Sequence, residues 1–164
     1  MDFITNILEQ IKDAPPILQF AGIWLISVIP FLEAYIAVPI GIAVGLPFWM
    51  TIAVAIIGNW LSVALVVLVS ERGQKWLQRR RAAKHNSGAS SKRMQRASDL
   101  FNKYGVPGVA FIGPLLIGNH IGAFISILSG ASKRYVLLWQ TISIIVWALG
   151  TGVLVALGVD LINR

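Results

Sequence analysis

Apolar residues dominate this chain in two kinds of stretch. Residues 48–70 and 135–159 are apolar nearly throughout and contain neither a charged residue nor a proline. At 1.5 Å per residue, a helix over either stretch would be about 35 Å long, enough to cross the hydrocarbon core of a bilayer. Residues 17–47 and 105–132 are also apolar, but proline and glycine interrupt them. The pattern predicts an all-α integral membrane protein in which residues 1–164 form a single membrane domain.

The two interrupted stretches carry helix-breaking residues: Pro30 and Pro39 in the first, and Gly113 and Pro114 in the second. Backbone groups freed at such breaks cannot face lipid and must be satisfied inside the protein. Helical hairpins that enter and leave at the same membrane face meet this requirement. We therefore expect re-entrant hairpins over 17–47 and 105–132, with full crossing of the membrane by both stretches as the alternative.

The two halves of the chain repeat the same order of a broken stretch followed by an uninterrupted one. Shifted by about 85 residues, 17–70 lies over 105–159. The breakers then coincide: Pro30 and Glu33 fall near Pro114 and Gly118, and Gly45 falls on Gly130. Because each half would enter from the opposite side, this predicts an inverted-topology repeat.

The positive charges are gathered in one segment. Charged residues make up 13% of the chain, about half the usual share of a soluble domain. Ten of the 14 Lys and Arg residues lie between Arg72 and Lys103. With re-entrant hairpins this segment shares a membrane side with Lys133 and Arg134, which the positive-inside rule makes the cytoplasmic side. We expect a multi-pass protein of a prokaryotic cell membrane with both termini outside.

Two amphipathic segments complete the predicted organisation. Residues 1–14 are predicted to form a short helix in the membrane interface, because their apolar residues follow one helical face. Residues 71–104 are predicted to form a basic cytoplasmic linker that ends in an amphipathic helix over 91–104. Membrane lipids are the partners that these segments imply.

Several classes of function are disfavoured. A pI near 10.3 could indicate nucleic-acid binding, but the basic residues flank apolar runs as juxtamembrane charges do. The chain has no cysteine, two histidines and seven acidic residues, so we expect no metal centre and no cofactor. Phosphate-binding loops, zinc-protease patterns and nucleophile elbows are absent from the sequence, so we do not expect an enzyme.

Two segments resemble a known family. Residues 31–47 (FLEAYIAVPIGIAVGLP) and 101–130 (FNKYGVPGVAFIGPLLIGNHIGAFISILSG) are similar to the two hairpins of the small multidrug export protein family, within the wider DedA or VTT-domain superfamily. The resemblance implies a compact bundle with two opposed hairpins and a role in proton-linked transport or lipid translocation. DedA members carry arginines in or after the second hairpin, whereas residues 105–132 contain none.

Glu33 is the leading candidate for chemistry, since it is the only charged residue in 17–47. An ionised acid at the bilayer centre costs about 2.5–3.5 kcal/mol, so we expect Glu33 to face the protein interior and to couple transport to protons or substrate. A Glu33 solvated at the hairpin turn is the alternative. Asn119 and His120 fall at the second tip, where they could relay protons and pair with Glu33, or satisfy freed backbone groups.

The uninterrupted stretches contain three further polar residues: Asn59, Gln140 and Ser143. We expect them to form hydrogen bonds between helices rather than to contact substrate. Lys133 and Arg134 are expected to mark the cytoplasmic boundary of the second stretch.

The sequence favours a small secondary transporter or lipid translocator that is coupled to protons. Its substrate would be amphipathic, either a polyprenyl-phosphate-type lipid or a hydrophobic drug-like cation. Because two spans and two hairpins make a thin wall around any pathway, we expect a homo-oligomer, with a dimer favoured. The alternative is a membrane scaffold that transports nothing and whose basic loop docks a partner or anionic lipid.

Overall fold

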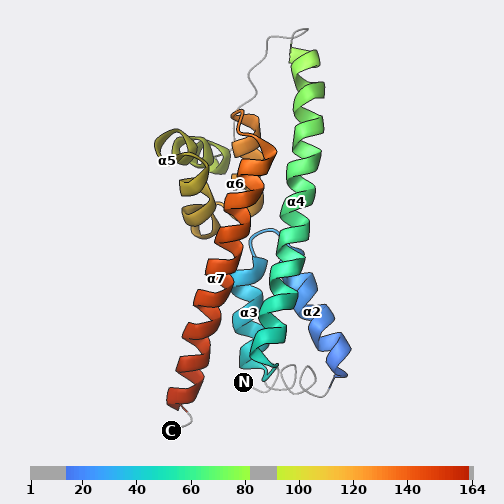
Figure 1. The fold of residues 1–164 in the computed structure, drawn as a ribbon, viewed down its shortest axis with the longest axis vertical. Coiled ribbons are helices and arrows are strands. Elements are labelled where there is room, and N and C mark those ends of the chain that lie inside the picture. Colours follow the sequence, from blue (N-terminus) through green and yellow to red (C-terminus); the bar gives the residue numbers. More distant parts are fainter. Residues whose placement is uncertain (1–13, 82–91, 163–164) are drawn as a thin grey trace. The chain divides into compact units, whose positions relative to one another are not determined.

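The computed structural model describes residues 14–81 and 92–162, and within these residues the chain forms six helices and no strand (Figure 1). The helices are α2 (Pro16–Val28), α3 (Glu33–Ala43), α4 (Phe48–Arg81), α5 (Lys92–Leu116), α6 (Asn119–Leu128) and α7 (Lys133–Ile162). The prediction of an all-α chain is confirmed. The helix expected over 1–14, apart from residue 14, and the middle of the basic linker, 82–91, lie outside the described residues.

Two of these helices are long and apolar enough to cross a membrane: Phe48–Ser70 within α4 and Lys133–Gly158 within α7. Many of their large apolar side chains are exposed, including Leu65 and Leu154. A helix in the core of a soluble protein would bury such residues. The exposed apolar faces therefore favour a membrane setting.

Helix α4 continues beyond its apolar part. The sequence predicts a linker from residue 71, but the backbone stays helical to Arg81. Residues 71–81 (ERGQKWLQRRR) are rich in Glu, Gln, Lys, Leu and Arg, which have high helix propensity. Local propensity thus extends the helix into the basic segment.

The chain divides into two compact units, and both boundaries fall inside long helices. Unit 1 contains α2, α3, α4 up to Trp60 and α7 from Ile144. Unit 2 contains α4 from Leu61, α5, α6 and α7 up to Ser143. Each unit therefore holds one pair of shorter helices together with a part of both long helices.

In unit 1, α2 and α3 form an antiparallel pair (Figure 1). The buried face of α3 carries small residues at helical spacing: Ala34, Ala37, Val38 and Gly41. A Cβ atom added at Gly41 would collide with Cγ2 of Thr51 in α4 and would lie 3.2 Å from Cδ1 of Ile23 in α2. Small residues at this face let three helices approach closely, as is common between membrane helices.

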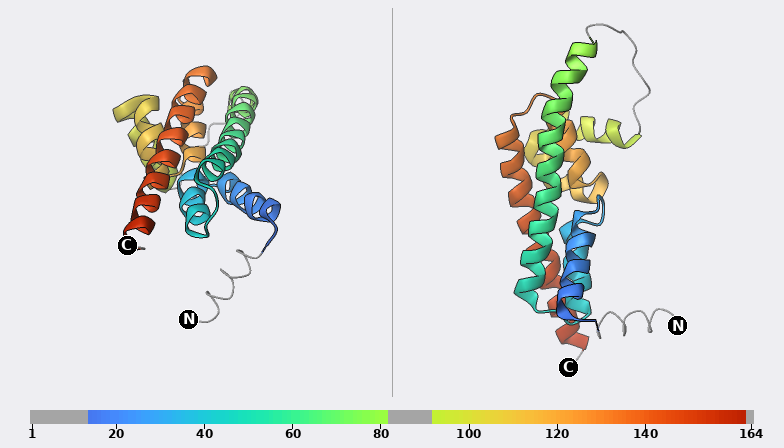
Figure 2. Two further views of the ribbon diagram at one scale, coloured as in Figure 1. Left: turned by 60° about the horizontal axis from the view of Figure 1, so that its bottom comes forward. Right: turned by 90° about the vertical axis from the view of Figure 1, so that its right-hand side faces the viewer.

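In unit 2, α5 changes direction at Gly105, whose φ of 65° and ψ of −163° are not helical. Figure 2 shows the first segment of α5, residues 92–104, lying across the direction of the second. The second segment pairs with α6, and Val109, Ile117 and Ile125 form the core of the pair. A Cβ atom added at Gly122 of α6 would lie 2.7 Å from Cγ1 of Val109, so this pair also depends on close approach.

The ends of α3 and α6 share one backbone motif. Gly45 follows α3 with φ 91°, and Gly130, 85 positions later, follows α6 with φ 92°. The next N–H group donates back into each helix: Leu46 to the Gly41 carbonyl at 2.9 Å, and Ala131 to the Ser126 carbonyl at 3.1 Å. This glycine-dependent C-cap recurs at the offset that the sequence predicts. The inverted relation of the halves and the re-entrant course of the hairpins remain predictions.

The prolines do not all act as breakers. Pro30 lies in the turn between α2 and α3, and Pro114 lies in the last turn of α5. Pro39, in contrast, lies inside α3, which continues to Ala43. It therefore does not end a half-helix as the sequence predicts. A membrane helix tolerates an internal proline where neighbouring groups satisfy the freed carbonyl.

Candidate functional site

The tip of the first hairpin places Glu33 at the start of α3. The N–H groups of Leu32 and Glu33 both donate to the carbonyl of Ile29, at 3.2 Å each. The Glu33 side chain is 0% exposed. Burial of this degree disfavours a solvated carboxyl group at the turn.

Two residues at this tip adopt the left-handed backbone conformation, which favours glycine. Phe31 has φ 75° and Glu33 has φ 51°. Such values in residues other than glycine cost about 1–3 kcal/mol each, and for a bulky side chain they are rare. The surrounding fold must therefore offset this cost, and backbone strain of this kind is concentrated at functional sites.

The tip of the second hairpin follows a similar backbone path. The N–H groups of Ile117 and Gly118 both donate to the carbonyl of Gly113, at 2.8 Å each. Gly118 has φ 84° and lies 85 positions after Glu33. Glu33 thus stands where the second half of the chain has a glycine.

Asn119 and His120 begin α6 immediately after this tip, and both are buried. Nε2 of His120 lies 2.9 Å from Oγ of Ser62 in α4, within hydrogen-bond distance. The contact brings two polar side chains, from α4 and α6, together within unit 2.

Ser143 of α7 hydrogen-bonds to the neighbouring helix α5. Its hydroxyl group donates to the carbonyl of Ala110 at 2.6 Å. That carbonyl is the one that Pro114 leaves without its helical donor, because proline has no N–H group. Ser143 therefore satisfies a backbone group freed by a proline, which agrees with the expected hydrogen bond between helices.

Gln140 lies one turn before Ser143 and is 1% exposed. Its Nε2 atom would be 3.8 Å from a Cβ atom at Gly122, so it packs against α6. Neither amide atom has a hydrogen-bond partner among the described residues. The hydrogen bond expected of Gln140 is therefore not seen there.

The remaining predicted residues divide between the units. Unit 2 holds Asn119, His120, Gln140 and Ser143, whereas Glu33 and the buried Asn59 belong to unit 1. A pairing of Glu33 with His120 stays a prediction. Lys133 and Arg134 are exposed at the start of α7. Among the described residues, no three His, Cys, Asp or Glu side chains form a group that could hold a metal ion.

Two features at or beside these tips are not predicted from the sequence. Ser62 is one turn after Asn59 on α4, and its polarity within an apolar stretch is the signal that could have revealed it. The left-handed conformation of Phe31 has no such signal, because an aromatic residue ordinarily disfavours it.

Comparison with protein families gives one match. A family model described as "Putative small multi-drug export protein" matches residues 33–149, which is more than half of the chain. The chain belongs to this family. The matched region begins at Glu33, the last residue of the first hairpin tip, and includes the whole of the second tip. The resemblance seen in the sequence is thereby confirmed at the level of this family. Placement in the DedA or VTT-domain superfamily remains a prediction.

No curated protein and no solved structure matches the chain. The family description and the two long apolar helices together support a transporter in a membrane rather than an enzyme.

Proposed function

We propose that this protein is a proton-coupled membrane transporter that exports hydrophobic cations, with Glu33 as the group that binds a proton and the substrate in turn. The observation that carries the proposal is Glu33 itself, fully buried and left-handed at a position where the other half of the chain has Gly118. Strain kept at a buried acid supports a role for that acid.

The buried charges favour a cationic substrate over an anionic one. Among the described side chains, the buried groups that can carry charge are Glu33 and His120, and no lysine or arginine is buried. A lipid-linked phosphate moving past Glu33 would meet a group of its own sign. A hydrophobic cation would neutralise the carboxylate and offset the cost of its burial.

The coupling follows from this cost. A carboxylate in an apolar interior is costly, and we propose that the Glu33 carboxyl group holds a proton and the cation in turn. Entry of a proton from one side would release the cation, and departure of the proton would restore the binding site. A proton gradient would thereby drive export.

The test is reconstitution into liposomes with an imposed pH gradient. Uptake of tetraphenylphosphonium would be compared with movement of a labelled polyprenyl phosphate, for the wild type, Glu33→Gln and Asp99→Asn. The last variant makes the same carboxyl-to-amide change at an exposed residue of α5. We expect gradient-driven cation transport in the wild type and Asp99→Asn, and background levels in Glu33→Gln.

Other outcomes redirect the proposal. Full transport with unchanged pH dependence in Glu33→Gln would exclude its role in coupling. Movement of the polyprenyl phosphate alone would identify a lipid translocator. Movement of neither substrate by the wild type would favour the scaffold that the sequence offers as the alternative.

A further inference from the structure

The first segment of α5, residues 92–104, carries an exposed basic surface that the proposed transport does not use. We propose that this surface binds the headgroups of anionic phospholipids. The inference rests on the membrane setting of the proposed function but not on transport. It assigns a lipid site to unit 2.

Packing fixes which face of the segment points outward. Leu100 and Phe101 pack against the core of unit 2 formed by Val109, Ile117 and Ile125. The change of direction at Gly105 sets the segment across the second part of α5, as Figure 2 shows. A helix anchored on one face in this way presents a constant outer face.

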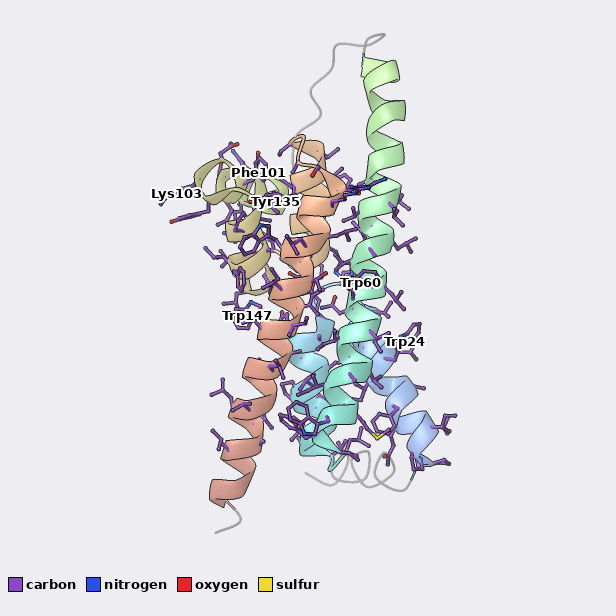
Figure 3. The ribbon with its side chains drawn as sticks, in the orientation of Figure 1. Trp24, Trp60, Phe101, Lys103, Tyr135 and Trp147 are labelled. Carbon is purple, nitrogen blue, oxygen red and sulfur yellow. The ribbon has the colours of Figure 1, made fainter. Side chains whose placement is uncertain are left out.

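That outer face is basic. Lys92, Arg96 and Lys103 are exposed, and Figure 3 shows Lys103 extending outward from α5. In residues 92–104 the sequence has four basic residues and one acid, Asp99. Each lysine or arginine near a membrane of anionic lipids adds an attraction that a zwitterionic surface does not supply.

Lys103 and its neighbour form a lipid-interface pair. Nζ of Lys103 lies 5.0 Å from the centroid of the exposed Tyr104 ring. A hydrogen bond with the Tyr104 side chain raises the pKa of Lys103 above its ordinary value. Basic and aromatic side chains side by side are typical of the headgroup level of a membrane.

The start of α7 has the same character in the same unit. Lys133, Arg134 and Tyr135 are exposed there, and Figure 3 shows Tyr135 and Lys103 at the same end of unit 2. A boundary between apolar and basic residues at the start of a long apolar helix marks the membrane surface. A lipid phosphate at that level would meet basic groups from two helices.

The test uses the full chain purified in a neutral detergent. Phosphatidylglycerol, phosphatidylcholine or inorganic phosphate would be added, and the shift in thermal unfolding and the ratio of bound lipids by native mass spectrometry would be measured. The variant is Lys92→Gln with Arg96→Gln and Lys103→Gln. Its control is Gln95→Ala with Asn102→Ala, which changes exposed uncharged residues of the same segment.

For the wild type and the control, we expect phosphatidylglycerol to raise the unfolding temperature more than phosphatidylcholine does, and to be bound in excess. In the triple variant the ratio of bound phosphatidylglycerol to bound phosphatidylcholine should fall to near one. Circular dichroism should show an unchanged helix content. High salt should weaken the wild-type preference, because screening shortens the reach of exposed charges.

An equal response of the wild type to both lipids would overturn the inference, as would a triple variant that keeps the full preference. A shift of equal size with inorganic phosphate would also overturn it, because the site would then recognise free anions rather than lipid. Transport is not measured in this experiment, so its result and the failure of the proposed exporter are separable.

Discussion

The tips of the two hairpins follow related backbone paths with different residues. In each tip, one carbonyl accepts hydrogen bonds from two successive N–H groups, of Leu32 and Glu33 in the first and of Ile117 and Gly118 in the second. The last donor has positive φ in both tips. Gly118 adopts this conformation without cost, whereas Glu33 does not.

This difference separates what the backbone needs from what function needs. The second tip shows that glycine is sufficient to close such a turn. The first tip carries an acid at the corresponding position and a second left-handed residue, Phe31. Because neither choice improves the turn, the acid is best explained by its chemistry. The difference between the two tips therefore supports the functional role proposed for Glu33.

The largest expected effect on transport comes from replacing Glu33 with glycine, the residue at the corresponding position of the second tip. Glu33→Gly should abolish transport driven by a pH gradient, because the carboxyl group is gone. It should also stabilise the protein by about 1 kcal/mol, since glycine adopts positive φ freely. Thermal unfolding in detergent should show a rise of about 2–4 °C. Glu33→Gln, which keeps a side chain on the left-handed backbone, should lose transport without this rise.

Gly118→Ala is the matched control for this change. At φ 84° and ψ 149° a side chain is strained, so this variant should lose about 1–3 kcal/mol. If Glu33→Gly lowers the unfolding temperature while Gly118→Ala leaves it unchanged, the assignment of strain to the first tip is wrong.

Much of this comparison was accessible from the sequence. The two uninterrupted stretches fall within α4 and α7, and the offset of about 85 residues pairs Gly45 with Gly130 as the structure does. The long helices follow from the length of the stretches and their lack of charge, and the paired helix ends follow from the positions of glycine. All of these are properties of neighbouring residues. For the same reason the sequence singled out Glu33 as an interior residue.

Features that depend on a partner elsewhere in the chain were not accessible. Pro39 is predicted to break a helix because a proline removes a hydrogen bond of its own helix, but α3 continues through it. Ser62 lies within hydrogen-bond distance of His120 only because α4 and α6 pack together. Gln140 has no partner among the described residues, although a hydrogen bond was the natural expectation. Helix propensity depends on residues that are neighbours in the sequence, whereas the surroundings of these three side chains depend on how the helices pack.

The second expected effect tests whether both hairpins depend on the same kind of close approach. Gly41→Ala and Gly122→Ala should each destabilise the protein by about 1–3 kcal/mol, because the new methyl group overpacks its helix contact. For Gly41 the contact is Cγ2 of Thr51, and for Gly122 it is Cγ1 of Val109. Thermal unfolding measures both.

Second substitutions should restore stability where the contact is the cause. Thr51→Ser removes the colliding methyl group but keeps the hydroxyl group that donates to the Pro47 carbonyl at 2.9 Å. For Gly122→Ala, the second substitution is Val109→Ala, which removes the Cγ1 atom that the new methyl group would meet. Gly150→Ala, where an added Cβ atom meets nothing within 4 Å, should be neutral or slightly stabilising. Rescue in one unit but not in the other would show that the two hairpins pack by different means.

The smallest expected effect concerns the carbonyl of Ala110, for which Pro114 supplies no donor. Ser143→Ala removes its hydrogen bond and should cost about 0.6 kcal/mol, the average for such bonds between membrane helices, and at most about 1.7 kcal/mol. Pro114→Ala supplies an N–H group that can bond to this carbonyl within α5. In the double variant the loss from Ser143→Ala should therefore shrink, and a double-mutant cycle measures the coupling.

Thr141→Val separates this bond from the general effect of a hydroxyl group on α7. The Thr141 hydroxyl donates to the Leu137 carbonyl of its own helix at 2.7 Å, and that carbonyl already lies within the helical hydrogen-bond ladder. Its loss should be smaller than that of Ser143→Ala. Equal losses, or a cycle without coupling, would mean that Ser143 does not compensate for Pro114. The second hairpin would then tolerate its proline by some other means, as the first tolerates Pro39.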